Sequence, residues 1–109
     1  MNLTPVRLGD TAVVVGTGMI GVLTIQALRA PGCARVIAVD PSEERLALAR
    51  PLGATEKFTA PAQRNADLAI ECVGNKDSVR AAISAVRKGG AVTLAGNVAP
   101  IRSGRLDYL

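Results

Sequence analysis

The chain of 109 residues contains no histidine and no tryptophan, and only two cysteines, one phenylalanine and one tyrosine. Two thiols without an imidazole are too few for a tetrahedral zinc site or a cysteine–histidine catalytic pair. We therefore expect Cys33 and Cys72 to be reduced thiols of the core. The shortage of aromatic rings also counts against a single-stranded nucleic acid partner, because the bases of such a ligand stack on rings.

Long hydrophobic runs and clustered charges are also missing. No apolar stretch approaches the roughly 18 residues of a membrane span, and no signal-peptide pattern opens the sequence. We therefore expect a cytoplasmic protein without membrane contacts. The net charge of +4 is spread along the chain, which predicts no nucleic-acid partner. The apolar residues make up 49% of the chain and lie in short aliphatic runs, which is typical of a parallel sheet covered on both faces.

A glycine-rich turn follows the first of these runs. After Ala-Val-Val-Val at 12–15, a G-x-G-x-x-G pattern is formed by Gly16, Gly18 and Gly21. Between a strand and a helix, the first glycine permits a tight turn, the second lets a pyrophosphate approach the main chain, and the third brings the helix against the sheet. The amides of Met19 and Ile20, at the positive end of the helix, would then face the phosphates. The alternative is a turn that serves strand–helix packing alone.

The second apolar run ends in an acid. Asp40 follows Val-Ile-Ala-Val at 36–39, about 20 residues after the glycines, which is the spacing of the ribose-binding acid in dinucleotide folds. Its carboxylate can accept hydrogen bonds from both ribose hydroxyls and would repel a 2′-phosphate, so the pattern favours NAD over NADP. Arg45, in the first turn of the next helix, could reach the same ribose or lie over the adenine. The alternative for Asp40 is an acid that caps the end of a strand, and the alternative for Arg45 is a surface arginine without a ligand.

Strands and helices alternate along the sequence. We expect strands at 11–15, 35–39, 67–73 and 91–95, a short strand near 57–59, and helices at 19–29, from Ser42 toward Leu48, and at 77–87. The alternation predicts an α/β fold, a Rossmann-like doubly wound parallel sheet of about five strands. One dinucleotide-binding domain would occupy residues 1–100, followed by a tail at 101–109.

Three details of the helices can be predicted. The first is apolar nearly all round and should be deeply packed. Pro51 should end the second helix early or kink it. The third carries one apolar face, made by Val79, Ala82, Ile83 and Val86.

In open α/β sheets the ligand lies beyond the carboxyl ends of the strands. Val73 and Gly74 follow the fourth strand and are expected beside the adenine. The end of the fifth strand is expected beside the nicotinamide, and it comprises Ala95, Gly96 and Asn97. Glu71 lies in the otherwise apolar fourth strand. Because no acid/base partner or metal ligand accompanies it, we interpret Glu71 as a polar side chain at a strand end.

Taken together, these stretches resemble the cofactor domain of medium-chain dehydrogenases, in particular the zinc-type alcohol and polyol dehydrogenases. The resemblance is carried by residues 8–21, 36–40, 52–55, 66–74, 86–90 and 94–100. It covers most of the chain, and the set is specific although each piece alone is not. The resemblance implies NAD binding at Gly16, Gly18, Met19, Ile20, Gly21, Asp40, Arg45, Val73, Gly74, Ala95, Gly96 and Asn97.

In that family, hydride passes between an alcohol carbon and the nicotinamide while a zinc ion polarises the oxygen. The zinc ligands belong mainly to a separate amino-terminal domain, which is not among these 109 residues. The resemblance therefore implies the NAD(H)-binding domain of such an oxidoreductase, with no catalytic and no metal-binding residue in this chain. The chain alone is expected to be inactive.

Two departures from the family pattern carry structural predictions. Only Ala60 to Ala66 remain between the short strand and the fourth strand, where the family carries a crossover helix. Residues 101–109 resemble a segment that follows the sixth strand in the family. The sheet should therefore lack that crossover helix and a sixth strand, which would leave the fifth strand as an exposed edge for self-association.

Two other functions fit parts of the pattern. The missing catalytic groups would suit a non-catalytic module that senses NAD(H) or scaffolds a partner. An S-adenosylmethionine-dependent methyltransferase also uses a glycine turn and an acid after the second strand. The spacing from Gly18 to Gly21 argues against the methyltransferase.

Overall fold

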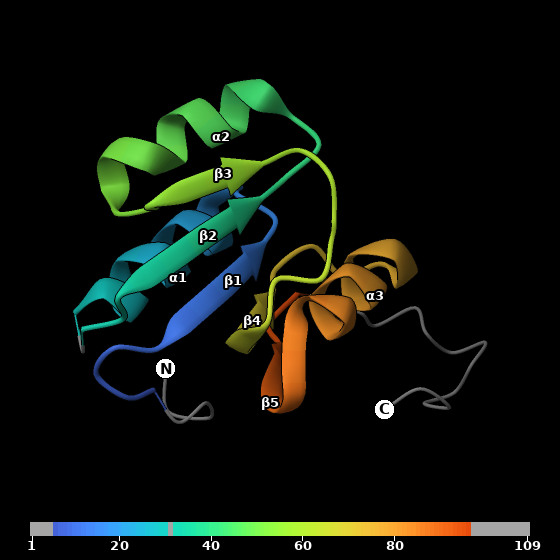
Figure 1. Cartoon of the computed structure of the whole chain (residues 1–109). Helices are drawn as coiled ribbons and strands as arrows, with labels where there is room; N and C mark the ends of the chain where they lie inside the picture. The colour runs from blue at the N-terminus through green and yellow to red at the C-terminus, as the bar shows by residue number, and fades with distance from the viewer. Residues whose placement is uncertain (1–5, 31, 97–109) are drawn as a thin grey trace.

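A computed structural model of the chain describes residues 6–30 and 32–96 (Figure 1). Its elements, in chain order, are β1 (Thr11–Val15), α1 (Met19–Arg29), β2 (Arg35–Val39), α2 (Glu43–Ala49), the 3-10 helix η1 (Arg50–Leu52), β3 (Glu56–Phe58), β4 (Ala66–Glu71), α3 (Lys76–Ala85) and β5 (Val86–Leu94). None of the helices in the described part has the length and apolar character needed to span a membrane.

The strands form one parallel sheet in the order β3-β2-β1-β4-β5. The chain builds outward from β1 to β3 and then returns to β4 on the other side of β1. This reversal places a topological switch point between β1 and β4, which is where open α/β sheets bind their ligands. The α/β fold with five parallel strands is confirmed.

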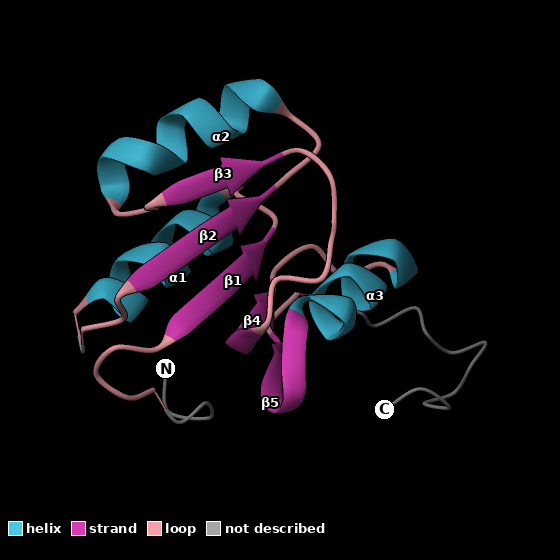
Figure 2. Cartoon of the chain, viewed as in Figure 1, coloured by secondary structure: helices cyan, strands magenta, loops and turns pink. Residues whose placement is uncertain are grey.

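Helices cover the sheet on both faces (Figure 2). On one face α1 and α2 bury Ile25, Leu28 and Leu46 against alternate residues of the strands. On the other face the buried cluster includes Ala82 and Ala85 of α3. Residues 12–15 of β1 are buried on both sides of the sheet, which explains why these strands are continuous apolar runs without polar alternation.

The expected all-round packing of α1 is wrong. Met19, Ile20 and Leu23 are 80%, 52% and 57% exposed, while Ile25 and Leu28 are fully buried. The helix lies on the outside of a sheet, so only one of its sides meets the strands. Its other side exposes these three apolar residues together with Gln26.

The third helix is shorter than predicted and the fifth strand longer. Helix α3 ends at Ala85, Val86 already belongs to β5, and Ile83 is 55% exposed, so only part of the predicted apolar face is buried. The register with β4 shifts between Ala66 and Leu68, and Gly89 within the extra stretch has a φ of +81°. Gly89 and Gly90 lie in this irregular stretch of β5 and do not end the helix. Strand β4 also ends earlier than predicted, at Glu71.

The second helix follows its sequence closely. The Ser42 side chain accepts a hydrogen bond from the Arg45 amide at the start of α2. Pro51 lies in η1, directly after α2 ends at Ala49, so the early end of this helix is confirmed. Gly53 closes the turn with a φ of +125°.

No helix occurs in the connection from β3 to β4, as predicted (Figure 1). Residues 59–65 cross on the side of the sheet that carries α3, where the Arg64 amide donates to the Ala85 carbonyl at 3.2 Å. The Arg64 guanidinium lies 3.8 Å from the ring centroid of Phe58. Within the described residues β5 pairs with β4 only. Residues 101–109 lie outside the described residues, so the missing sixth strand and self-association through β5 stay predictions.

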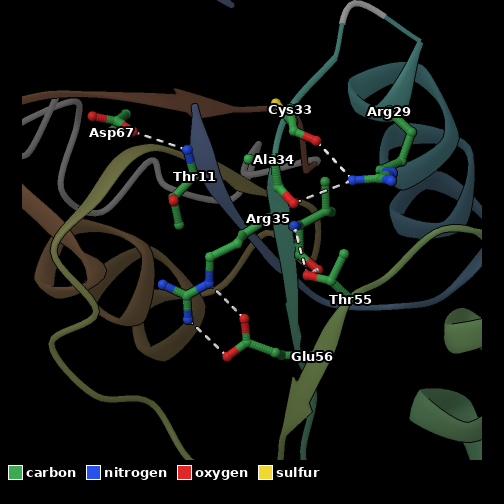
Figure 3. A network of polar contacts seen from close by, with 9 residues as sticks. Thr11, Arg29, Cys33, Ala34, Arg35, Thr55, Glu56 and Asp67 are labelled. Carbon is green, nitrogen blue, oxygen red and sulfur yellow. Dashed lines mark hydrogen bonds and ion pairs between the residues drawn. The ribbon is translucent and has the colours of Figure 1, made fainter. Parts of the chain in front are cut away.

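Polar contacts connect neighbouring elements near the amino-terminal ends of the strands (Figure 3). The Thr11 amide donates to Asp67 at 2.9 Å, which joins β1 to β4. Arg35 of β2 forms a two-pronged ion pair with Glu56 of β3, at 2.6 and 2.7 Å. Arg29 of α1 donates to the Cys33 carbonyl at 2.7 Å. These contacts all lie at the amino-terminal ends of the strands. The turns after the carboxyl-terminal ends of the strands lie at the opposite side of the sheet.

Candidate dinucleotide site

The glycine turn after β1 has the geometry that its pattern predicts. Gly16 has a φ of +97°, in the region that favours glycine. A Cβ built at Gly21 would lie 1.8 Å from the Gly16 carbonyl oxygen, so only glycine allows α1 to approach the turn this closely. A Cβ at Gly18 would meet no atom within 4 Å. The middle glycine therefore borders open space, while the other two are required by conformation and packing.

The amino end of α1 is open to an anion. Gly18 is the N-cap, no side chain caps it, and the first turn contains no acid. The first bond of the helix runs from the Val22 amide to the Gly18 carbonyl at 2.9 Å. The amides of Met19 and Ile20 therefore have no acceptor within the helix. They lie at the positive end of the helix dipole, where negative charge is stabilised.

Asp40 lies directly at the glycine turn. One of its oxygens accepts hydrogen bonds from the amide and hydroxyl of Thr17 at 2.8 and 3.0 Å. The other accepts from the Ser42 amide at 2.8 Å, at the start of α2. Arg45 donates to both oxygens at 3.1 Å. This carboxylate thus joins the turn after β1 to the helix after β2.

The acceptor capacity of Asp40 is full, which the sequence did not reveal. A carboxylate offers about four lone-pair sites, and the side chain of Asp40, 3% exposed, already receives the contacts from Thr17, Ser42 and Arg45. The Arg45 side chain is 54% exposed. Of the side-chain donors, Arg45 is the exposed one, whereas Thr17 is buried, so Arg45 is the donor that a ligand can reach and displace.

The pKa of Asp40 reflects two opposing effects. Burial raises it, but the hydrogen bonds from Arg45, Thr17 and Ser42 together outweigh burial and leave the pKa below its usual value. The carboxylate is therefore charged at neutral pH. That charge is compensated by Arg45.

A cavity of about 440 Å³ opens at this place. It lies within the size range of small-molecule sites. Of the predicted residues, Gly16, Asp40, Arg45 and Val73 line it. The crossover segment adds Thr59 and Pro61, and α3 adds Ser78 and Ala81, none of which the sequence singled out. Thr59 and Pro61 belong to the short segment that replaces the crossover helix, and this segment forms one wall of the cavity.

Glu71 lies under the neighbouring turn. Its position at the end of β4 was predicted, but it is fully buried, which the interpretation as a polar strand-end residue missed. One oxygen, Oε2, accepts hydrogen bonds from the Val73 amide at 2.7 Å, the Gly74 amide, and the Ser78 hydroxyl at 2.6 Å. The sequence offered one indication of this role, an acid in an otherwise apolar strand followed by a glycine turn.

The turn after β5 packs on the turn after β4. The amides of Ala95 and Gly96 both donate to the main-chain oxygen of Glu71, at 2.8 and 2.9 Å. A Cβ at Gly96 would lie 2.5 Å from the Gly74 amide nitrogen, so the two turns touch through their main chains. The structure thus brings Val73, Gly74, Ala95 and Gly96 together. Asn97 lies outside the described residues.

The two cysteines are free, and neither joins a metal cluster. Cys33 is buried and Cys72 is partly buried. Burial raises the pKa of both thiols, so neither is a reactive thiolate at neutral pH. Across residues 6–30 and 32–96, no group of three or more histidine, cysteine, aspartate or glutamate side chains is placed to hold a metal ion.

Comparison with known proteins assigns the family. The model of the zinc-binding dehydrogenase family matches residues 19–104. The chain belongs to this family. The match begins at Met19, so Gly16 and Gly18 are supported by the turn geometry and not by the family model.

Individual relatives agree with the family match. Alcohol dehydrogenase 6 of Peromyscus maniculatus is 33% identical over 113 residues, which cover 91% of the chain and 30% of that protein. Alcohol dehydrogenase TADH from Thermus sp. ATN1 has a TM-score of 0.77 and 30% identity, over 93% of the chain and 35% of its own. A Sinorhizobium meliloti 1021 protein described as a zinc-binding dehydrogenase, solved bound to NADP, has a TM-score of 0.80 and 28% identity, over 87% of the chain and 32% of its own. The chain spans about a third of the length of the relatives it matches.

Proposed function

We propose that this chain is the NAD(H)-binding domain of a zinc-type alcohol or polyol dehydrogenase. The observation that carries the proposal is the contact between Asp40 and the glycine turn. Through Thr17, the ribose-binding acid and the open amino end of α1 are held in one rigid unit beside a cavity. A turn built for strand–helix packing alone would need neither the acid nor the open space at Gly18.

The proposed cofactor lies across the carboxyl edge of the sheet. The pyrophosphate approaches Gly18 and the amides of Met19 and Ile20, where the helix dipole stabilises its charge. The adenosine half occupies the cavity beside Asp40 and Arg45. Val73 and Gly74, after β4, border the adenine side, and the nicotinamide half lies along the turn after β5, at residues 95–97.

The carboxylate of Asp40 favours NAD over NADP. In the proposed complex the ribose hydroxyls take the place of Arg45 on Asp40, because the other donors belong to the main chain or to the rigid turn. A 2′-phosphate would meet the charge of Asp40 at this point. The solved neighbour from Sinorhizobium meliloti carries NADP, which supports a dinucleotide in general and makes the preference worth measuring.

The chemistry of the family is hydride transfer, which the dinucleotide supplies when bound. The described residues offer no metal-binding cluster, and the chain has no histidine. A zinc ion that polarises the alcohol oxygen would therefore need ligands from outside this chain. We propose that the chain binds the cofactor and orients it, and that alone it does not turn over an alcohol.

A module that senses NAD(H) or scaffolds a partner is the second candidate, and the lack of catalytic groups in the chain favours it. The family match supports the dehydrogenase domain, and it counts against the methyltransferase that the glycine turn alone would allow. The two surviving candidates share the same cofactor site and differ in what it serves.

Calorimetric titration of the purified chain with NADH, NADPH and S-adenosylmethionine tests the proposal. We expect NADH to bind, NADPH to bind more weakly, and S-adenosylmethionine not to bind. A chain that is folded by circular dichroism but binds no NADH at millimolar concentration would refute the proposal. Adding zinc and alcohols with NAD should give no NADH absorbance, and a steady rise would contradict the proposed inactivity of the isolated chain.

A further inference from the structure

The buried carboxylate of Glu71 joins two loops that come from different strands. Its Oε2 holds the turn from β4 to α3 through the Val73 and Gly74 amides. Its main-chain oxygen holds the turn after β5 through the amides of Ala95 and Gly96. A single residue therefore fixes both turns that border one side of the proposed cofactor site.

The contacts of this carboxylate are unevenly distributed. Three donors converge on Oε2, whereas the buried Oε1 has no hydrogen-bond partner. A buried polar atom without a partner is unfavourable for folding. Stability alone therefore does not account for a glutamate here. Its charge does strengthen the bonds to the two amides, since hydrogen bonds to an ionised acceptor are about twice as strong as neutral ones.

The position of Oε1 points to the contact between the two turns. A Cβ at Gly96 would lie 2.9 Å from Oε1 and 2.8 Å from the Val73 carbonyl carbon, so Gly96 rests directly on the glutamate and its turn. Ser78, which donates to Oε2 at 2.6 Å, also lines the adenosine cavity. Any change at Glu71 therefore reaches the cofactor site through the main chain of both turns and through the first turn of α3.

We propose that Glu71 is a positioning residue of the cofactor site, whose buried carboxylate sets the spacing between the turn at 73–74, on the adenine side, and the turn at 95–96, on the nicotinamide side, so that one dinucleotide can span both. The proposal rests on the function proposed above. Glu71 is too deeply buried to touch the ligand and acts through the main chain of the turns.

Comparing the affinities for AMP and for NADH distinguishes a positioning role of Glu71 from a general structural role. AMP occupies the adenosine cavity, where Val73 is the only one of the four turn residues in the lining. NADH extends along all four. A loss of general stability would weaken both ligands equally, whereas misplaced turns weaken NADH more than AMP.

The test compares Glu71→Gln, Ser78→Ala and the control Glu56→Gln by calorimetry with NADH and with AMP. Glutamine keeps an oxygen for the three donors and removes the charge, and alanine at 78 removes only one donor. We expect Glu71→Gln to weaken NADH binding about tenfold, or about 1.4 kcal/mol, and AMP binding less than about twofold. Ser78 lines the adenosine cavity and belongs to the capping box of α3, so Ser78→Ala should weaken AMP and NADH binding by similar factors. Glu56→Gln removes a carboxylate at the opposite edge of the sheet and should change neither affinity.

The outcomes separate the two proposals. If the wild-type chain binds no NADH, the proposed function fails. If the wild-type chain binds NADH and a folded Glu71→Gln variant binds it within twofold of wild type, or loses NADH and AMP affinity by the same factor, the positioning role alone is overturned. If Glu71→Gln does not fold, Glu71→Asp decides, because aspartate keeps the charge and only shortens the side chain: a greater loss of affinity for NADH than for AMP supports the positioning role, and equal losses overturn it.

Discussion

Replacement of Gly21 by alanine tests the packing between α1 and the glycine turn. The added Cβ would lie 1.8 Å from the Gly16 carbonyl oxygen and 2.8 Å from its carbon, both main-chain atoms. Neither can rotate away, so the helix must move outward by about 1 Å or the turn must distort. Overpacking of this kind costs roughly 1–3 kcal/mol. Alanine returns up to about 1 kcal/mol through its higher helix propensity.

The net expected loss is about 1 kcal/mol of unfolding free energy. For a domain of this size, each kcal/mol lowers the melting temperature by about 4–8 °C, so the melting temperature should fall by about 4–8 °C. Urea and thermal unfolding followed by far-ultraviolet circular dichroism measure both quantities. An unfolding free energy within about 0.5 kcal/mol of wild type would refute the close approach of α1 to Gly16.

Gly18→Ala is the matched control, because it makes the same change three residues earlier. Gly18 has a φ of −73° and no atom near the position of a Cβ. Alanine should therefore leave the stability unchanged within about 0.5 kcal/mol, as expected for a surface position. The new methyl group would occupy the proposed path of the pyrophosphate and weaken NADH binding at least about tenfold. Unchanged affinity would place the phosphates elsewhere.

Two predictions concern Asp40 and its partner. Arg45→Ala removes the competitor for the ribose hydroxyls and the cation nearest a 2′-phosphate, so the ratio of the NADPH to the NADH dissociation constant should rise about tenfold; a ratio equal to that of wild type would contradict the exchange at Asp40. Because the pKa of Asp40 is lower in the folded state, its contribution to stability is present above the unfolded value of about 3.9 and is lost as the pH falls through the folded value. Urea unfolding between pH 6 and pH 2 should therefore show a smaller loss of stability in Asp40→Asn than in wild type, and parallel curves would count against the shift.

The fold was predictable because its strands are buried on both faces. Residues 12–15 and 36–39 are uninterrupted apolar runs, and each is followed by a turn that the local sequence encodes. The bounds of β1, α1 and β2 match the prediction. Local chemistry also decided the start of α2 at Ser42 and its end before Pro51.

The errors arose where distant contacts decide the outcome. The end of α3 depends on the crossover segment, whose Gln63 side chain and Arg64 amide donate to the carbonyls of Val86 and Ala85. Periodicity within the helix carries no information about those donors. Likewise the exposed side of α1 carries the large apolar residues Met19, Ile20 and Leu23, so hydropathy did not exclude them from the core.

The candidate site shows the same division. The roles of the glycines could be predicted from the sequence because each role is local, in a turn or at a close approach of two main-chain segments. The hydrogen bonds of the two buried carboxylates were not predicted. Asp40 receives a bond from Thr17, 23 residues earlier in the chain, and Glu71 receives its bonds from the turn and helix that directly follow it. Each carboxylate binds main-chain amides at the start of a turn and so fixes amides and carbonyls that side-chain substitution cannot move. A site whose ligand contacts are largely main-chain groups depends on such carboxylates to hold those groups in place. Removing one of them should therefore weaken ligand binding more than it lowers the stability of the fold.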